Sequence, residues 1–192
     1  IYDPAWHYGC VLLGDPTIMP LSSRGAATAQ AEPPGERWPG SRDYVKVSSS
    51  AYSDCHPTTA SSGDYTYVAW LTGQNGRLDV AARIYDGDSW SQVYVIDPDE
   101  YWDVTPSLCV NGSGVPYLAW ADFDYSSYGY RIRVAYGATF QTVTTAVSTL
   151  GYNTDPKLAF TDRMWLVWQA WNRAEGDIKV RALDSSFPET FI

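Results

Sequence analysis

The chain has 192 residues, of which 18% are charged and 15% aromatic, and Trp and Tyr are used far more often than Met. This composition favours strands, on which aromatic residues pack well, over a helical bundle. A net charge of −9 disfavours nucleic acid and anionic membranes as partners, and the sequence holds no run of about 18 apolar residues that would predict a transmembrane helix.

The first 20 residues predict a short apolar strand that ends in a Gly-Asp-Pro turn. Residues 9–18 resemble the closing segment of gingipain-like, caspase-related cysteine peptidase domains, which end in an aromatic-rich stretch, a hydrophobic strand and Gly-Asp-Pro. The resemblance implies that residues 1–22 are the tail of a secreted bacterial peptidase domain. It transfers no catalytic role to His7 or Cys10, because the catalytic pair of that family lies upstream of this motif.

Residues 23–35 are rich in Ser, Ala, Gln, Pro and Gly and lack apolar periodicity, which predicts a linker. An outer strand is expected over 36–48, because Trp38 and the apolar run after it resemble Trp90 and the residues that follow it. The chain begins with Ile1 and shows no signal peptide, so we expect a fragment or a processed product of a longer protein.

The rest of the chain repeats itself with a period of about 50 residues. The repeating positions are a proline at 57, 106 and 156 and a tryptophan at 70, 120 and 168. Because several positions keep the same spacing, the sequence predicts three repeats, at about 50–98, 99–148 and 149–192.

Each repeat predicts four antiparallel strands. The first follows the proline, the second ends in the tryptophan, the third alternates in hydrophobicity, and the fourth starts at Trp90, Phe140 or Phe187. The alternating residues of the third strands are Leu78 and Val80, Ile132 and Val134, and Ile178 and Val180. One sheet cannot bury both of its faces alone, so we expect an all-β fold in which the sheets stack as the blades of a partial β-propeller.

The segment 85–90, Tyr-Asp-Gly-Asp-Ser-Trp, is similar to the Asp-box turn of sialidase-type propeller repeats in extracellular bacterial proteins. Its spacing is shorter than in that family, and the leading Ser is replaced. The resemblance implies a secreted protein. It implies no glycosidase activity by itself, because the Asp box is a structural turn.

In such blades, the loops between second and third strands emerge at the same end as the loops between blades. Aromatic residues beside carboxylates at this end suit sugar stacking or a protein hot spot. The candidate ligand-binding residues are Tyr101, Trp102, Asp122, Asp124, Tyr125, Tyr128, Trp171 and Asn172. The structural alternative is that the aromatic residues cover blade edges and the Asp residues cap turns, and the apparent repetition of Asp54, Asp103 and Asp155 favours it.

Other chemistry has weaker support. Asp97, Asp99, Glu100 and Asp103 are a conceivable calcium site, but a solvated acidic loop is the preferred interpretation, and we expect no metal or cofactor.

Cys55 and Cys109 are either buried thiols or a bridge between neighbouring blades. A sialidase site needs three converging arginines, which the sequence does not establish, so no residue is predicted to be catalytic and enzymatic activity is left open.

We therefore hypothesise a non-catalytic binding or spacer module of a larger secreted bacterial protein, contacting a glycan or a protein. One alternative is part of a sialidase-like glycoside hydrolase. The other is an assembly protein whose incomplete propellers pair between chains. Propellers have about four to eight blades, so three repeats call for further blades from missing sequence or for a homo-oligomer.

Overall fold

The structure, a computed structural model, describes residues 45–48, 53–73, 76–99, 101–148, 151–171 and 175–183. All of them belong to one compact unit, Asp43–Ile192. The predicted peptidase-like tail and linker lie outside the described residues, as do Asn172 and the fourth strand expected from Phe187.

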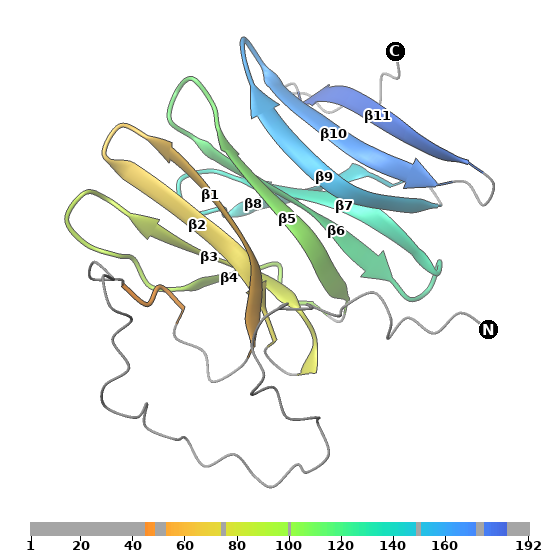
Figure 1. The fold of residues 1–192 in the computed structure, drawn as a ribbon, viewed down its shortest axis with the longest axis horizontal. Helices are drawn as coiled ribbons and strands as arrows, with labels where there is room; N and C mark the ends of the chain where they lie inside the picture. The colour runs from red at the N-terminus through yellow and green to blue at the C-terminus, as the bar shows by residue number, and fades with distance from the viewer. Residues whose placement is uncertain are drawn as a thin grey trace, which may run out of the picture. The chain divides into compact units, whose positions relative to one another are not determined.

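The described residues form an all-β fold of three successive antiparallel blades (Figure 1). Blade 1 consists of β1 (Asp54–Ser62), β2 (Tyr65–Thr72), β3 (Asp79–Tyr85) and β4 (Tyr94–Ile96). Blade 2 consists of β5 (Trp102–Val110), β6 (Pro116–Asp124), β7 (Gly129–Tyr136) and β8 (Thr142–Val147). Blade 3 consists of β9 (Tyr152–Phe160), β10 (Met164–Trp171) and β11 (Gly176–Leu183).

The first strands of the three blades lie next to one another, as expected for the inner strands of a propeller. Strand β5 contacts both β1 and β9 (Figure 1). One parallel bridge, between Tyr130 and Tyr152, joins blade 2 to blade 3. The predicted all-β propeller class is therefore confirmed, with neighbouring blades packed face to face.

Every inner strand carries a β-bulge at its repeated proline. The residue before the proline has a positive φ in all three blades: 52° at His56, 52° at Thr105 and 51° at Asp155. Proline has no N–H to donate to the ladder, so a bulge accommodates it inside a strand. The inner strands consequently begin three or four residues before the proline, at Asp54, Trp102 and Tyr152, and not after it as predicted.

The core lies between the blades in two apolar clusters. The first joins Val80 of blade 1 to Leu118 and Trp120 of blade 2. The second joins Ile132 of blade 2 to residues of β10 that include Trp168. The repeated tryptophan on the second strand is thus a packing residue that faces the preceding blade in blades 2 and 3.

Two predicted details at the outer strands differ from the structure, and a third lies mostly outside the described residues. Trp90 forms an isolated bridge with Tyr85, and β4 begins only at Tyr94. Phe140 is buried just before β8. Of the outer strand expected over 36–48, only 45–48 are described, and these four residues have no strand assignment.

The Asp-box-like segment is a tight turn. Asp86 Oδ1 accepts hydrogen bonds from the backbone N–H groups of Asp88 (3.0 Å) and Ser89 (2.7 Å). These bonds hold the pKa of Asp86 below its ordinary value. The side chain is therefore occupied in stabilising the turn between β3 and Trp90.

Cys55 and Cys109 are thiols and form no disulfide with each other. Cys55 packs against the first apolar cluster and Cys109 against the second. Burial raises the pKa of the Cys109 thiol. The alternative of a bridge between these two cysteines is wrong, and both are free thiols that are only partly buried.

Candidate functional site

Aromatic side chains form a row across blades 2 and 3 at the end that carries the β6–β7 and β10–β11 connections, which we call the rim. Tyr101 stacks on Tyr125 with 6.5 Å between ring centroids, and Tyr125 meets Phe123 edge to face at 5.0 Å. Phe123 lies 4.9 Å from Tyr130, and Tyr130 lies 6.1 Å from Tyr152. We call the aromatic row these five residues and Trp171, which is the cross-strand partner of Tyr152.

The row follows from strand register. Phe123 and Tyr125 are two residues apart at the end of β6, and Tyr130 lies opposite Phe123 on β7. Tyr125, Tyr152 and Trp171 keep 46%, 46% and 47% of their surface exposed. The rings are therefore held by their neighbours while part of each remains open to solvent, which suits a binding surface.

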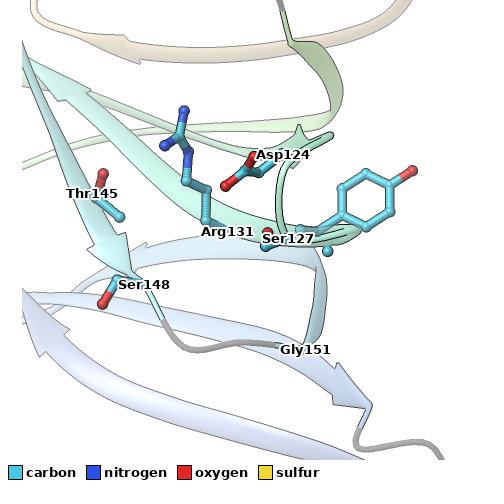
Figure 2. A pocket seen from close by; sticks show the side chains of 8 residues that line it. Asp124, Ser127, Arg131, Thr145, Ser148 and Gly151 are labelled. Carbon is cyan, nitrogen blue, oxygen red and sulfur yellow. The ribbon is translucent and has the colours of Figure 1, made fainter.

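A polar pocket of about 230 Å³ adjoins the row between the β6–β7 turn and the start of β9 (Figure 2). Its lining residues are Asp124, Ser127, Gly129, Tyr130, Arg131, Thr145, Ser148 and Gly151. Figure 2 shows Asp124 and Arg131 on one side of the space and Thr145 and Ser148 on the other. Tyr130 belongs to both the row and the pocket, so the two features form one surface.

Arg131 links this surface to the acidic residues behind it. Its Nε and Nη2 atoms both lie 2.7 Å from Asp122 Oδ2, and Nη2 lies 3.8 Å from Asp99 Oδ2. The guanidinium also sits over the ring of Tyr101, 4.8 Å from its centroid. Partial burial disfavours its charge, but the bond to Asp122 raises the pKa of Arg131, so the cation persists and positions Tyr101.

The carboxylates beneath the rim are held inside the interface of blades 1 and 2. Burial raises the pKa of Asp103 to about 9, and burial also raises the pKa values of Asp79 and Asp122. Asp103 Oδ2 accepts the Val80 N–H at 2.9 Å. Asp103 is only 3% exposed, so it fastens blade 2 to β3 and is not presented to a ligand.

The repeated acidic position was assigned wrongly in the third repeat. The position three residues before each proline holds Asp54, Asp103 and Asn153, whereas Asp155 is an exposed residue at the bulge. Asn153 Nδ2 donates to the Tyr130 carbonyl at 3.1 Å, and its Oδ1 accepts from Trp168 Nε1 at 3.0 Å. Asp103 and Asn153 thus stabilise contacts between blades, whereas Asp54 accepts a hydrogen bond from Trp70 Nε1 within blade 1, and these contacts differ from the turn capping that the structural alternative expected.

The structure brings together three of the predicted ligand-binding residues and separates others. Tyr101, Asp122 and Tyr125 meet around Arg131, and Trp171 ends the row. Asp124 caps the β6–β7 turn by accepting the Ser126 N–H at 2.8 Å.

Trp102 is half-buried on β5, where it lies directly opposite Phe123 of the aromatic row. Tyr128 projects from the β6–β7 turn. None of these placements tests ligand binding, so the ligand-binding roles stay predictions.

Sequence reasoning did not select Phe123, Tyr130, Arg131 and Tyr152 as ligand-binding residues. It also did not select the pocket residues Ser127, Gly129, Thr145, Ser148 and Gly151. Phe123 could have been selected, because it lies two residues before Tyr125 at the end of β6, and this spacing places both rings on one face. Tyr130 and Tyr152 belong to different blades, and only the packing of blade 2 on blade 3 brings them into contact.

Of the four conceivable calcium ligands, Glu100 lies outside the described residues and the other three form other contacts, Asp103 by accepting the Val80 N–H. Asp97 pairs with Arg133, and Asp99 pairs with Arg131. Among the described residues, no group of three or more His, Cys, Asp or Glu side chains is placed to hold a metal ion. Within the same part of the chain, no helix has the length and apolar character needed to cross a membrane.

No protein-family model and no curated protein matches the chain. Among solved structures, it is similar to an endo-arabinase from Bacteroides thetaiotaomicron VPI-5482, with 12% identity, 65% of this chain and 53% of that chain covered, and a TM-score of 0.46. An endo-1,4-beta-xylanase from the same organism has 15% identity, with coverage of 73% and 53% and a TM-score of 0.46.

An exo-1,5-alpha-L-arabinanase from a bovine ruminal metagenomic library has 8% identity, with coverage of 69% of this chain and 76% of that chain and a TM-score of 0.31. This chain spans about half the length of the first two structures. At these TM-scores the likenesses carry no functional argument.

Proposed function

We propose that the aromatic row and the adjoining pocket bind a carbohydrate chain, and that these blades are a binding module of a larger secreted protein. The observation that carries the proposal is the series of contacting rings from Tyr101 to Tyr152, with Trp171 opposite Tyr152 on β10 and a pocket with hydroxyl and carboxylate groups beside it. Sugar rings offer C–H faces that stack on aromatic side chains and hydroxyls that pair with polar groups.

The pocket supplies both kinds of hydrogen-bonding group that a sugar needs. Hydroxyls of Ser127, Thr145 and Ser148 can donate and accept, and the Asp124 carboxylate accepts. Arg131 is partly exposed but is already neutralised by Asp122 and Asp99. The site therefore favours a neutral sugar over one that carries a carboxylate.

Hydrolysis is the second candidate, because Asp103 has a pKa of about 9 and is protonated at neutral pH, as a general acid must be. A general acid must also reach the glycosidic oxygen of the substrate. Asp103 is 3% exposed, and one of its oxygens accepts the Val80 N–H. This burial favours binding without cleavage by the described residues.

The test is binding of the chain to immobilised neutral and acidic polysaccharides, compared with Tyr125→Ala and Trp171→Ala variants. Each truncation removes a stacking partner worth about 1 kcal/mol, so we expect roughly fivefold to tenfold weaker binding to a neutral glycan. Tyr65→Ala is the matched control, because Tyr65 is 49% exposed on β2 and belongs to no part of the row.

Equal losses in the Tyr65 control and the row variants would contradict the proposed surface. Binding that survives both row substitutions would contradict it as well. Release of reducing sugar by the unmodified chain is measured in parallel. Such release would show that the chain is a hydrolase, in contradiction to the proposed non-catalytic binding module.

A further inference from the structure

The third strand of each blade has two apolar positions that face the next blade. In blades 1 and 2 these positions are fully buried, at Val80 and Ala82 and at Ile132 and Val134. In blade 3 the same positions are Ile178, which is 75% exposed, and Val180, which is 57% exposed. We call Ile178 and Val180 the open face of blade 3.

The equivalence of these positions rests on strand register. The tryptophans Trp70, Trp120 and Trp168 lie opposite Ala81, Arg133 and Lys179, respectively. The residue before each of these partners is Val80, Ile132 or Ile178. The open face therefore has the same place in blade 3 that the interior interface has in the other two blades.

The established interfaces show what covers such a face. Leu118 and Trp120 on β6 cover the face of blade 1, and Leu166 and Trp168 on β10 cover the face of blade 2. In blade 1 the corresponding residues are Val68 and Trp70, which point away from blade 2. Val68 is half-buried and Trp70 is buried in the single chain, so most of any new apolar contact would come from blade 3.

A second observation concerns the segment 45–48 beside blade 1. Arg181 on β11 donates a hydrogen bond to the Ala146 carbonyl on β8, the outer strand of the preceding blade. Arg83 has the same register position on β3 and donates to the Val47 carbonyl at 3.0 Å.

The segment 45–48 thus occupies the place of an outer strand in a blade that would precede blade 1. None of the strands β1 to β11 pairs with it.

We propose that a second copy of this chain supplies a cover for the open face and a fourth strand for blade 3, two parts that are not among the described residues. The open face of blade 3 in one copy packs against blade 1 of the other copy. Residues 45–48 of that second copy then lie along β11 as the fourth strand of the blade. The inference goes beyond glycan binding, because it concerns a different surface and a partner of the same kind.

Continuity with the existing interfaces supports this partner. The chain itself carries the open face and, on blade 1, the surface that would face it, so two reciprocal contacts close a ring. Two copies with three blades each make six, which lies within the range of about four to eight blades for propellers. Closure also pairs the edge of β11 that no described strand pairs with, and an unpaired edge invites non-specific strand pairing.

The first experiment measures molar mass by light scattering over a range of chain concentrations. We expect twice the mass of one chain for the unmodified protein and the mass of one chain for Ile178→Asp combined with Val180→Asp. Tyr128→Asp is the control, because Tyr128 is also 75% exposed but lies on the β6–β7 turn. A single-chain mass at all concentrations overturns the proposal, as does a doubled mass that survives the paired substitutions.

The second experiment locates the contact by crosslinking. Two differently tagged forms, both with Cys10, Cys55 and Cys109 replaced by Ser, carry Val45→Cys or Val180→Cys and are mixed with a short bis-maleimide.

A crosslinked product that contains both tags is expected. Its absence overturns the proposed place of residues 45–48 and favours one of two competitors: the fourth strand predicted from Phe187, or a further blade of a longer polypeptide.

Discussion

At the scale of single residues, the position three before the inner-strand proline joins blade 2 to blade 1 and blade 3 to blade 2. Asn153 does so with a neutral amide that bonds to the Tyr130 carbonyl. Asp103 does so with a carboxyl group that accepts the Val80 N–H. The two side chains have the same shape, but only the carboxyl group can carry a charge into the interface, where charge is unfavourable.

Asp103 should therefore make the fold less stable as the pH rises. Its pKa of about 9 lies above the ordinary 3.8, so between these values the folded chain holds a proton that the unfolded chain has lost. The stabilisation is complete below the ordinary pKa and is lost as the pH rises through about 9.

Asp103→Asn removes this titration while keeping an oxygen for the Val80 N–H. We expect its melting temperature to exceed that of the parent by at least about 3 °C at pH 9, with a smaller difference at pH 5. Part of the decrease in melting temperature with rising pH should persist in this variant, because the pKa values of Asp79 and Asp122 are also raised. Thermal unfolding at pH 5, 7 and 9 measures this dependence, and Asp162→Asn, at an exposed position, is the control. If the melting temperature of Asp103→Asn falls with pH as steeply as that of the parent, Asp103 is not the group that titrates.

At the scale of strands, the same alternation has different consequences in different blades. Ile132 on β7 and Ile178 on β11 have the same register position, but Ile132 is fully buried and Ile178 is 75% exposed. The difference arises because blade 3 covers β7 whereas no described blade covers β11. Local sequence therefore determines which face is apolar, and the neighbouring sheet determines whether that face is buried.

Ile132→Ala should consequently be among the more damaging substitutions. Removing a fully buried Ile leaves a cavity between blades 2 and 3, at a cost of about 2–5 kcal/mol in the free energy of unfolding. Tyr65→Ala on β2, which is half exposed, should cost less than about 1 kcal/mol. Urea unfolding of the two variants measures the difference, and similar midpoints for both would contradict the assigned interface.

At the scale of the whole molecule, the net charge of −9 acts on every ligand that approaches the rim. Asp97, Asp99 and Asp124 add negative groups there, and the arginines Arg131 and Arg133 are paired. The field of the protein therefore repels polyanions and leaves neutral chains unaffected.

Binding to a neutral polysaccharide should change little between low and high salt. A polyuronate should not bind at low ionic strength, where screening is weakest and repulsion is strongest. Affinity electrophoresis or calorimetry at two salt concentrations measures the binding of both the neutral polysaccharide and the polyuronate. A polyuronate that binds more tightly as the salt is lowered would show that Arg131 is available to an anionic ligand.

The fold was largely predictable from the repeats, but details of the site were not. The spacing of Trp70, Trp120 and Trp168 was enough to indicate three stacked sheets. The assignment of Asp155 to the repeated acidic position was wrong, because Asp155 directly precedes its proline, as His56 and Thr105 do, and the position three residues before the proline holds Asn153. Of the aromatic row, only Phe123 and Tyr125, at the end of β6, have a spacing that predicts a shared face.

The sequence by itself determined which residues are apolar, how they alternate and that the pattern recurs, because these depend on the local geometry of strands. Only the tertiary structure decided that Tyr130 meets Tyr152, that Asp103 is buried at an interface and that Ile178 is left uncovered. These properties depend on which blade lies against which, and contacts between sheets join residues that are far apart along the chain.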